Sequence, residues 1–451
     1  MVPPVFLPSR ARDARPHAPR RHAMRAAARA LAAATGSVLA LALAVPALLA
    51  ASPGTARAAH TVITVATFPD LDRAARAALP RWNALHPDIE VHIASLQYAD
   101  HHTAMTTALA TGGGLPDVMA LDLRYIGKFA EGGGFEDLAR PPYGAAALRP
   151  RFVDYSFAQA TNSRGELVAM PTDIGPGTLL YRQDLLAKAG LAEADLTKSW
   201  ESFIAAGKVL KAKTGAYLLA DSGDIRDIVL RAGLPPGEGL YFDAKGQVLV
   251  DGPRFRRAFE LGRAAHVAGI DAHATAWTND WAAGFRNNRI ASQMMGAWLT
   301  GHLKNWLAPA TAGQWRSTGL PGGTYASYGG SFYAIPKKAV HKAEAWQFIL
   351  FLTNDRRSQV DALRTLDSFP ALKEAQDDPL FDEPIAFLGG QPARRLWRDI
   401  AAHVPAIPVN RLDAMATDVV RAEYDNVVNQ GKDIGAALAD ARALIERRAR
   451  R

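Results

Sequence analysis

The chain has 451 residues, enough for two or three domains or for one large two-lobed body. It contains no cysteine, which excludes disulfides, thiolate catalysis, cysteine-based zinc sites and a lipid-modified N-terminal cysteine. Its formal net charge of +8 would favour nucleic-acid binding, but residues 1–59 hold eight arginines and a single acid. The remaining residues are therefore close to neutral, which excludes a nucleic-acid-binding protein.

Residues 1–59 have the pattern of an export leader. From Met24, a short arginine-bearing segment precedes an apolar stretch, and small residues follow, so we expect cleavage after Ala58 or Ala59. Pro46 and the many small residues argue against a permanent membrane helix. We therefore expect a periplasmic protein that is secreted through a cleaved signal peptide and is not a lipoprotein.

Three strand-then-helix units follow the leader. The apolar runs "TVITVAT" (61–67), "EVHIASLQY" (90–98) and "DVMALD" (117–122) have strand length, and each precedes a segment of helical periodicity. This alternation predicts a parallel sheet with crossover helices, and ligands bind such sheets at the carboxyl ends of the strands. Tyr98 and Asp122 fall at two of these ends.

Three later segments are expected to cross between two lobes. Residues 166–183 and 319–336 each read as two strands around a Pro/Gly-rich connection without room for a helix, and 364–372 is a third crossing. The periodicity between and after them predicts further elements. Helices are expected around 184–190, 199–214, 253–268, 341–354 and 436–451, and strands at 216–221 and 290–296.

The sequence shows no catalytic signature. GxSxG, HExxH, the phosphate-binding GxxxxGK[ST] and a Rossmann glycine pattern are all absent. The adjacent His101 and His102 could bind a metal, but without a cysteine or a paired acidic cluster we expect two solvated residues at a helix start. We predict no enzyme activity, metal or cofactor. A pair of glycosidase carboxylates stays open, because their separation is spatial.

Trp298, in "QMMGAWLTG" (293–301), is the aromatic residue best placed for a ligand. It follows a strand and lies between Gly296 and Gly301, and glycines let another body approach the backbone. An indole presented there can stack on the apolar face of a sugar ring, whereas packing in the core is the alternative. Of the other tryptophans, Trp200 and Trp346 are predicted core residues, and Trp277 and Trp281 fit either role.

Five further residues could bind hydroxyl groups. Gly329 and Gly330 precede a strand and can expose N–H donors, and Ser331 adds a hydroxyl that donates and accepts. A hinge turn with positive φ is the alternative for the glycines. Asp122 and Asp173 can each accept charge-assisted hydrogen bonds from two vicinal hydroxyls, or can cap a helix or turn.

Four stretches, in this order, resemble the extracellular solute-binding proteins of carbohydrate ABC importers, the family-one or maltose-binding-like group. They are "GLPDVMALD" (114–122), "VAMPTDIGPGTLLYRQDLLAKAGL" (168–191), "FRNNRIASQMMGAW" (285–298) and "YGGSFYAIPKKAVHKAEAWQFILFL" (328–352). The chain departs from the family pattern at Arg182, which stands where asparagine is usual, and at Asn288, which replaces a glycine. It also has "LTKSW" where the family has a proline and threonine before the tryptophan.

The resemblance implies an α/β, two-lobed periplasmic binding protein fold (class II-like) with three inter-lobe crossings and a ligand cleft between the lobes. The first lobe would comprise residues 60–172 and 326–365, and the second 173–325 and 366–451. A sugar or oligosaccharide would be the ligand and an inner-membrane ABC permease the partner of a monomeric protein, without nucleic acid or stable membrane insertion. The implied cleft residues are Tyr98, Asp122, Asp173, Trp298, Gly329, Gly330, Ser331 and, as a weaker candidate, Asp70.

Two alternatives remain at this point. The same fold could bind a sugar phosphate, glycerol phosphate or another anionic solute, which would need cleft arginines such as Arg124, Arg226 or Arg286. A secreted carbohydrate-active enzyme is the other alternative, and it would show turnover.

Overall fold

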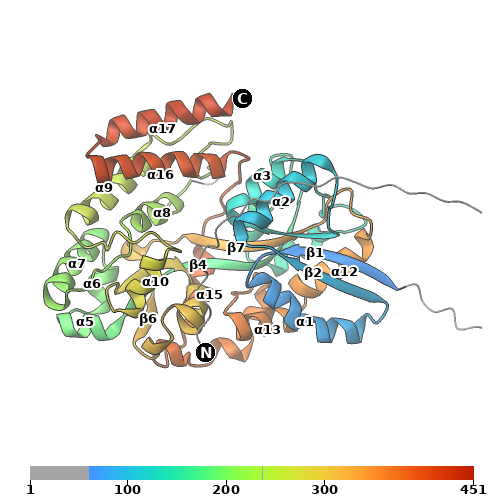
Figure 1. The fold of residues 1–451 in the computed structure, drawn as a ribbon, viewed down its shortest axis with the longest axis horizontal. Helices are drawn as coiled ribbons and strands as arrows, with labels where there is room; N and C mark the ends of the chain where they lie inside the picture. The colour runs from blue at the N-terminus through green and yellow to red at the C-terminus, as the bar shows by residue number, and fades with distance from the viewer. Residues whose placement is uncertain (1–59, 236, 451) are drawn as a thin grey trace, which may run out of the picture. The chain divides into compact units, whose positions relative to one another are not determined.

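The structure is a computed structural model that describes residues 60–235 and 237–450, so the predicted leader (1–59) lies outside it. The described residues form helices around a seven-stranded sheet (Figure 1). The strand order is β2-β1-β3-β7-β4-β5, and β6 pairs with β4 off this path. Within these residues, no helix combines the length and the apolar character that crossing a membrane requires.

The three predicted strand–helix units are confirmed. Their strands are β1 (Thr61–Thr67), β2 (Ile89–Ser95) and β3 (Val118–Asp122), with β1 lying parallel between the other two. Their helices are α1 (Leu71–Leu85), α2 (Tyr98–Thr111) and α3 (Leu123–Glu131). The first four residues of β3 are fully buried, as expected for a strand that is covered on both faces.

One strand end was predicted wrongly. β2 stops at Ser95, and Tyr98 is the first residue of α2 rather than the last of a strand. The N–H of His101 donates to the carbonyl of Gln97 at 2.8 Å and closes the first turn of α2. Because this turn begins at Gln97, the residues expected to end the strand are already part of the helix start.

β4 (Met170–Arg182) is a single strand of 13 residues whose pairing partners change along its length. Its first half pairs antiparallel with β7 (Ser327–Ala334), and its second half pairs with β5 (Ser292–Gly296) and β6 (Trp315–Thr318). The prediction that the Pro/Gly stretch separates two strands is wrong. The ladder instead absorbs this stretch as register shifts around 171–176, because bulges tolerate proline and glycine.

The three predicted crossings lie side by side. β7 runs between β3 and β4, and the third crossing runs along β4, where the N–H of Ile174 donates to the carbonyl of Phe369 at 2.9 Å. At Gly175 a Cβ would lie 1.9 Å from the carbonyl oxygen of Tyr328, so only glycine allows β4 and β7 to approach this closely. The boundaries of the two lobes stay a prediction.

Helices cover the β4–β5–β6 end of the sheet. In Figure 1, β7 and β4 run alongside each other between the β1–β2 pair and α5–α7. The predicted helices are found as α5 (Gln183–Ala189), α7 (Trp200–Thr214) and α9 (Pro253–Val267), and α10 (Asn279–Arg286) follows. The helices α6 (Glu193–Thr197) and α8 (Gly223–Arg231) were not predicted. The expected strand at 216–221 is only two isolated bridges, Tyr217 to Ile290 and Leu219 to Asp271, because each partner meets it at one residue.

The described residues after β7 are largely helical. Their helices are α12 (Lys342–Thr353), α13 (Arg356–Leu366), α14 (Lys373–Gln376), α15 (Ala393–His403), α16 (Asp413–Gln430) and α17 (Ile434–Ala449); the short α4 (Asp154–Gln159) precedes β4. Figure 1 shows α16 and α17 packed together beside α9, with which they share a buried cluster around Phe259 and Tyr424. α16 also meets α3, where Arg124 Nη2 lies 2.7 Å from Asp418 Oδ1.

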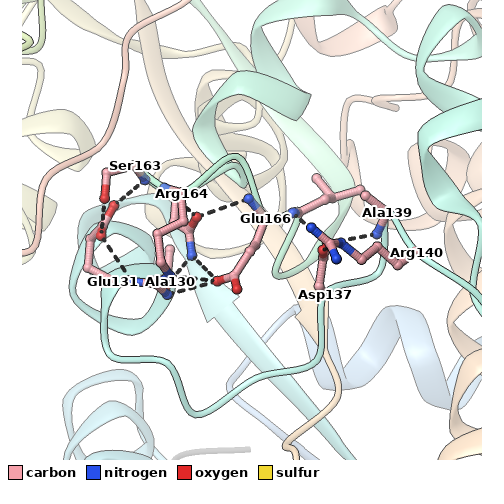
Figure 2. Close-up of polar contacts among 10 residues, drawn as sticks. Ala130, Glu131, Asp137, Ala139, Arg140, Ser163, Arg164 and Glu166 are labelled. Atoms are coloured by element: carbon pink, nitrogen blue, oxygen red, sulfur yellow. Dashed lines mark hydrogen bonds and ion pairs between the residues drawn. The ribbon is translucent and has the colours of Figure 1, made fainter.

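A turn before β4 is held by polar contacts (Figure 2). Glu131, at the end of α3, accepts hydrogen bonds from the N–H and the hydroxyl of Ser163 at 2.6 and 2.7 Å. Arg164 pairs with Glu166 at 2.8 Å, and Asp137 accepts from the N–H of Leu167 at 3.1 Å. These contacts fix the chain that leads into β4 and so the position of Asp173.

The departures from the family pattern at Arg182 and Asn288 contact each other. Asn288 adopts φ 57°, a left-handed conformation that asparagine tolerates, and its side-chain oxygen accepts a hydrogen bond from Arg182. Arg182 is 2% exposed and also donates twice to Asp184, at 2.7 and 2.8 Å. Arg182 is therefore part of the scaffold.

Candidate functional site

Asp122, Ser331 and Asp173 occupy one row across three neighbouring strands. Ser331 of β7 is paired with Asp122 of β3 on one side and with Asp173 of β4 on the other. Paired residues of an antiparallel ladder direct their side chains to the same face, and neighbouring strands lie about 4.8 Å apart. The structure thus brings three of the predicted residues together, with the Ser331 hydroxyl between two carboxylates.

Asp122 is held by two donors. The hydroxyl of Tyr98 donates to its Oδ1 at 2.6 Å, and the N–H of Arg124 donates to the same oxygen at 2.8 Å, so the predicted helix-capping role is confirmed. Burial raises the pKa of Asp122, and the hydrogen bond from Tyr98 partly offsets this rise. Tyr98 acts on the site by orienting this carboxylate.

His101 and His102 are buried, not solvated as predicted. Each is 1% exposed, because both lie on the face of α2 that packs against β3. His102 Nδ1 donates to the carbonyl of Tyr98 at 2.7 Å, and its Nε2 accepts from the N–H of Asp122 at 3.2 Å, which requires a neutral ring. Burial lowers the pKa of His102 to about 4. The pair therefore supports Tyr98 and Asp122.

Asp173 has an elevated pKa. Burial raises it to about 6, the hydroxyl of Ser331 lowers it, and the charge of Asp122 raises it. The hydroxyl of Ser368, in the third crossing, lies 3.3 Å from Oδ2 of Asp173 and also lowers the pKa. A carboxylate near its titration point changes its hydrogen-bonding capacity within the range of growth pH.

Trp298 lies at the start of α11 (Leu299–His302) and is partly exposed. Its Nε1 donates to the carbonyl of Tyr328 at 2.8 Å. A Cβ at Gly296 would lie 2.1 Å from that nitrogen, and one at Gly329 would lie 2.9 Å from it. The glycines of β5 and β7 therefore make room for the indole, which lies against backbone at the margin of the core.

An aromatic cluster surrounds this indole and consists of Trp277, Trp298, His302 and Trp306. Trp277 stacks on Trp298 with ring centroids 6.0 Å apart, and His302 meets both rings edge-on at 5.4 Å. Trp277 is 54% exposed and Trp306 48%. Trp277 also has φ 71°, which costs a bulky residue about 1–3 kcal/mol and is typical of functional sites. The sequence left the role of Trp277 open, and Trp306 was not singled out from it.

Asp70, the weaker candidate, lies beside the aromatic cluster. Its Oδ2 is 3.7 Å from His302 Nε2, and its Oδ1 pairs with Arg73 at 3.0 Å. The Nε1 of Trp306 donates to His302 Nδ1 at 2.9 Å, so the proton of a neutral His302 is on the nitrogen that faces Asp70. Burial lowers the pKa of His302, and the charge of Asp70 opposes that shift.

A set of buried polar contacts, also missed from the sequence, supports the aromatic cluster from the protein interior. Gln293, in the stretch that leads to Trp298, donates to Asp224 of α8 at 2.8 Å and accepts from Trp281 Nε1 at 2.9 Å. Trp281 is fully buried, and its ring centroid is 5.1 Å from that of Trp277. These contacts hold α10, the helix that follows Trp277, in position.

A sequence profile described as "Bacterial extracellular solute-binding protein" matches residues 66–357, more than half of the chain. The chain belongs to this family. The solute-binding protein is 29% identical to a lactose-binding protein of Rhizobium radiobacter over 362 residues, which cover 76% of this chain and 83% of the relative. It is 23% identical to an arabinooligosaccharide-binding protein of Bacillus subtilis (strain 168), covering 67% and 71%. A crystal structure of an extracellular solute-binding protein of family 1 matches with a TM-score of 0.75 and 26% identity over 86% of this chain and 99% of that one, which confirms the predicted fold class.

Gly329 and Gly330 of the solute-binding protein have φ 82° and 141°, so the predicted positive φ is confirmed, but both lie within β7 rather than in a turn, and a hinge role stays a prediction. Gly330 also pairs with Ile174 of β4. The proposed donation of their N–H groups to a ligand stays a prediction.

Of the two tryptophans predicted to lie in the core, one is buried and the other is only partly buried. Trp200 is buried, as predicted. The core prediction for Trp346 is wrong in part, because its ring lies at the margin of the core and meets Tyr143 edge-on at 5.6 Å.

The three arginines considered for an anionic ligand have different surroundings. Arg226 is 5% exposed, pairs with Asp227 at 2.8 Å and lies over the ring of Tyr424. Arg124 pairs with Asp418, and Arg286 is exposed at the end of α10. Two of the three arginines, Arg124 and Arg226, therefore form ion pairs within the protein.

Proposed function

We propose that this solute-binding protein captures a sugar or oligosaccharide in the periplasm and delivers it to an inner-membrane ABC permease. The observation that carries the proposal is the adjacency of two surfaces, the aromatic cluster and the carboxylate row of Asp122, Ser331 and Asp173. They share β7: Trp298 donates to the carbonyl of Tyr328 at 2.8 Å, and Ser331 follows three residues later, about 10 Å along a strand. The names of the relatives, which bind lactose and arabinooligosaccharides, support a carbohydrate ligand.

Each surface suits a different side of a sugar. A pyranose ring has apolar C–H faces, which stack on the indoles of Trp298 and Trp277. Its rim carries hydroxyls, and vicinal hydroxyls donate to Asp122 and Asp173 while Ser331 donates or accepts. Loss of one carboxylate would cost on the order of 2–3 kcal/mol of binding free energy, roughly 30- to 150-fold in Kd. The proposal involves no bond cleavage.

Closure of the two lobes would report the bound sugar to the permease. In the predicted division, Asp122 belongs to the first lobe and Trp298 to the second, so one ligand contacts both and stabilises the closed state. The bulged part of β4 and the positive-φ glycines of β7 are suited to the hinge. The proposal also includes a cleaved leader, no lipid anchor and a monomer.

A thermal-shift panel tests the proposal. Lactose, arabino-oligosaccharides, maltose, polyols and sugar phosphates are added separately to the purified protein. A true ligand at 100 times its Kd stabilises the native state by about 2.7 kcal/mol. We expect a shift with a neutral sugar that is lost in Trp298→Ala. A shift with sugar phosphates alone, or hydrolysis products after incubation with glycans, would contradict it.

A further inference from the structure

Three potential metal ligands meet where α9 ends. His266 lies in the last turn of α9, and Asp271 and His273 lie on the segment that follows. His266 Nδ1 is 3.2 Å and His273 Nδ1 is 3.8 Å from Oδ2 of Asp271. One ligand atom from each residue falls within 4.8 Å of the other two. The two imidazole rings meet edge-on with centroids 4.9 Å apart.

Asp271 is the unusual member. It is 1% exposed, yet its Oδ1 has no hydrogen-bond partner among the described residues. Leaving a buried polar atom without a partner is costly, and the cost is larger for a charged group. The backbone holds the residue in place, because Leu219 accepts from the N–H of Ala272 and donates to the carbonyl of Ile270, both at 3.0 Å.

A hydrogen bond between His266 and Asp271 explains part of this arrangement. It gives Oδ2 a donor and places an imidazole near the carbonyls at the end of α9. It leaves Oδ1 unsatisfied, and it does not explain why His273 adopts φ 55°, a conformation that few residues other than glycine adopt. That conformation brings the second imidazole to the same carboxylate.

We propose that His266, Asp271 and His273 bind a divalent cation of the zinc type. Tetrahedral zinc has ligands at about 2.0–2.1 Å, which places ligand atoms about 3.3 Å from each other, and the distances of 3.2 and 3.8 Å lie on either side of this value. Two imidazoles and one carboxylate favour zinc or its transition-metal neighbours over magnesium or calcium. Water would take the fourth position and would donate a hydrogen bond to Oδ1 of Asp271, the atom that His266 leaves unsatisfied. The cation would join the end of α9 to the segment that leads to Trp277.

Calorimetry of Zn²⁺ binding tests the site. The purified protein, without a histidine tag and treated with a chelator, is titrated with ZnCl₂ and separately with CoCl₂. We expect one cation per chain and the visible absorption of tetrahedral Co²⁺. His273→Ala changes an exposed side chain and should weaken binding by at least about tenfold, as should Asp271→Asn.

His92→Ala is the matched control, because His92 is another exposed histidine beside a carboxylate, 2.7 Å from Glu90. This variant should bind Zn²⁺ like the unaltered protein. The proposal is wrong if no stoichiometric binding occurs, if His273→Ala binds as tightly as the unaltered protein, or if His92→Ala loses the site. The absence of a tetrahedral Co²⁺ spectrum would also overturn it. Zn²⁺ binding and sugar binding are measured separately, so either proposal can fail without the other.

Discussion

The elevated pKa of Asp173 predicts that sugar affinity depends on pH. Burial raises this pKa to about 6, and the proposed role of Asp173, accepting hydrogen bonds from hydroxyls, requires the ionised form. If only that form binds, the apparent Kd increases by the factor 1 + 10^(pKa − pH). The affinity should therefore be nearly full at about pH 7.5 and about tenfold weaker at about pH 5.

Isothermal calorimetry with the sugar found in the panel, from pH 5 to 8, measures this change. Asp173→Asn should bind weakly throughout and remove most of the pH dependence. Ser368→Ala removes a hydroxyl that lowers the pKa of Asp173, so the midpoint should move to higher pH. Asp154→Asn changes an exposed carboxylate outside the candidate site, so this variant should keep the profile of the unaltered protein.

The sign of the effect is decisive. The acid form is favoured by burial, so affinity must fall as pH falls through the pKa. A Kd that is constant across this range, or that decreases at low pH, would refute the role of Asp173. Full pH dependence in Asp173→Asn would assign the titration to another group. Circular dichroism at pH 5 checks that the protein is folded.

Further predictions concern the aromatic cluster and the scaffold. Trp277→Ala and Trp277→Gly should both weaken sugar binding by about tenfold, since each removes an exposed ring. Only the glycine variant also relieves φ 71°, so it should be about 1 kcal/mol more stable than the alanine variant in urea unfolding; equal stabilities would remove the argument from strain. Arg182→Met should lower the free energy of unfolding by about 3 kcal/mol, because it leaves Asp184 and Asn288 without their donor, and the sugar Kd should not change. Arg286→Ala, at an exposed position, should change neither quantity, and a large loss of affinity in Arg182→Met would place that residue in the ligand site instead.

The parallel units and the crossings could be predicted because their signals are local. Each strand of the first units is a short apolar run followed by helical spacing, and the first two crossings contain Pro and Gly where a helix cannot form. The prediction that β4 would break failed for a tertiary reason. β5, β6 and β7 together supply partners along its whole length, so the ladder continues through the bulge.

The candidate site could be predicted only where a residue stands at a recognisable place in the sequence pattern. Asp122 ends an apolar run, Asp173 lies in the first Pro/Gly-rich crossing and Ser331 follows two glycines, but their alignment in one row depends on the antiparallel insertion of β7, which the sequence does not encode locally. Trp277 stayed open between a core and a ligand role because the local pattern shows neither its exposure nor its positive φ. His101 and His102 look polar and solvated in the sequence, and only the packing of α2 on β3 shows that they are buried.

A crystal structure of the protein with the sugar identified in the panel tests the central claim most directly. The account predicts a sugar ring stacked on the indole of Trp298, with hydroxyls within hydrogen-bond distance of Asp122 and Asp173. A sugar bound away from both the aromatic cluster and the carboxylate row would contradict it.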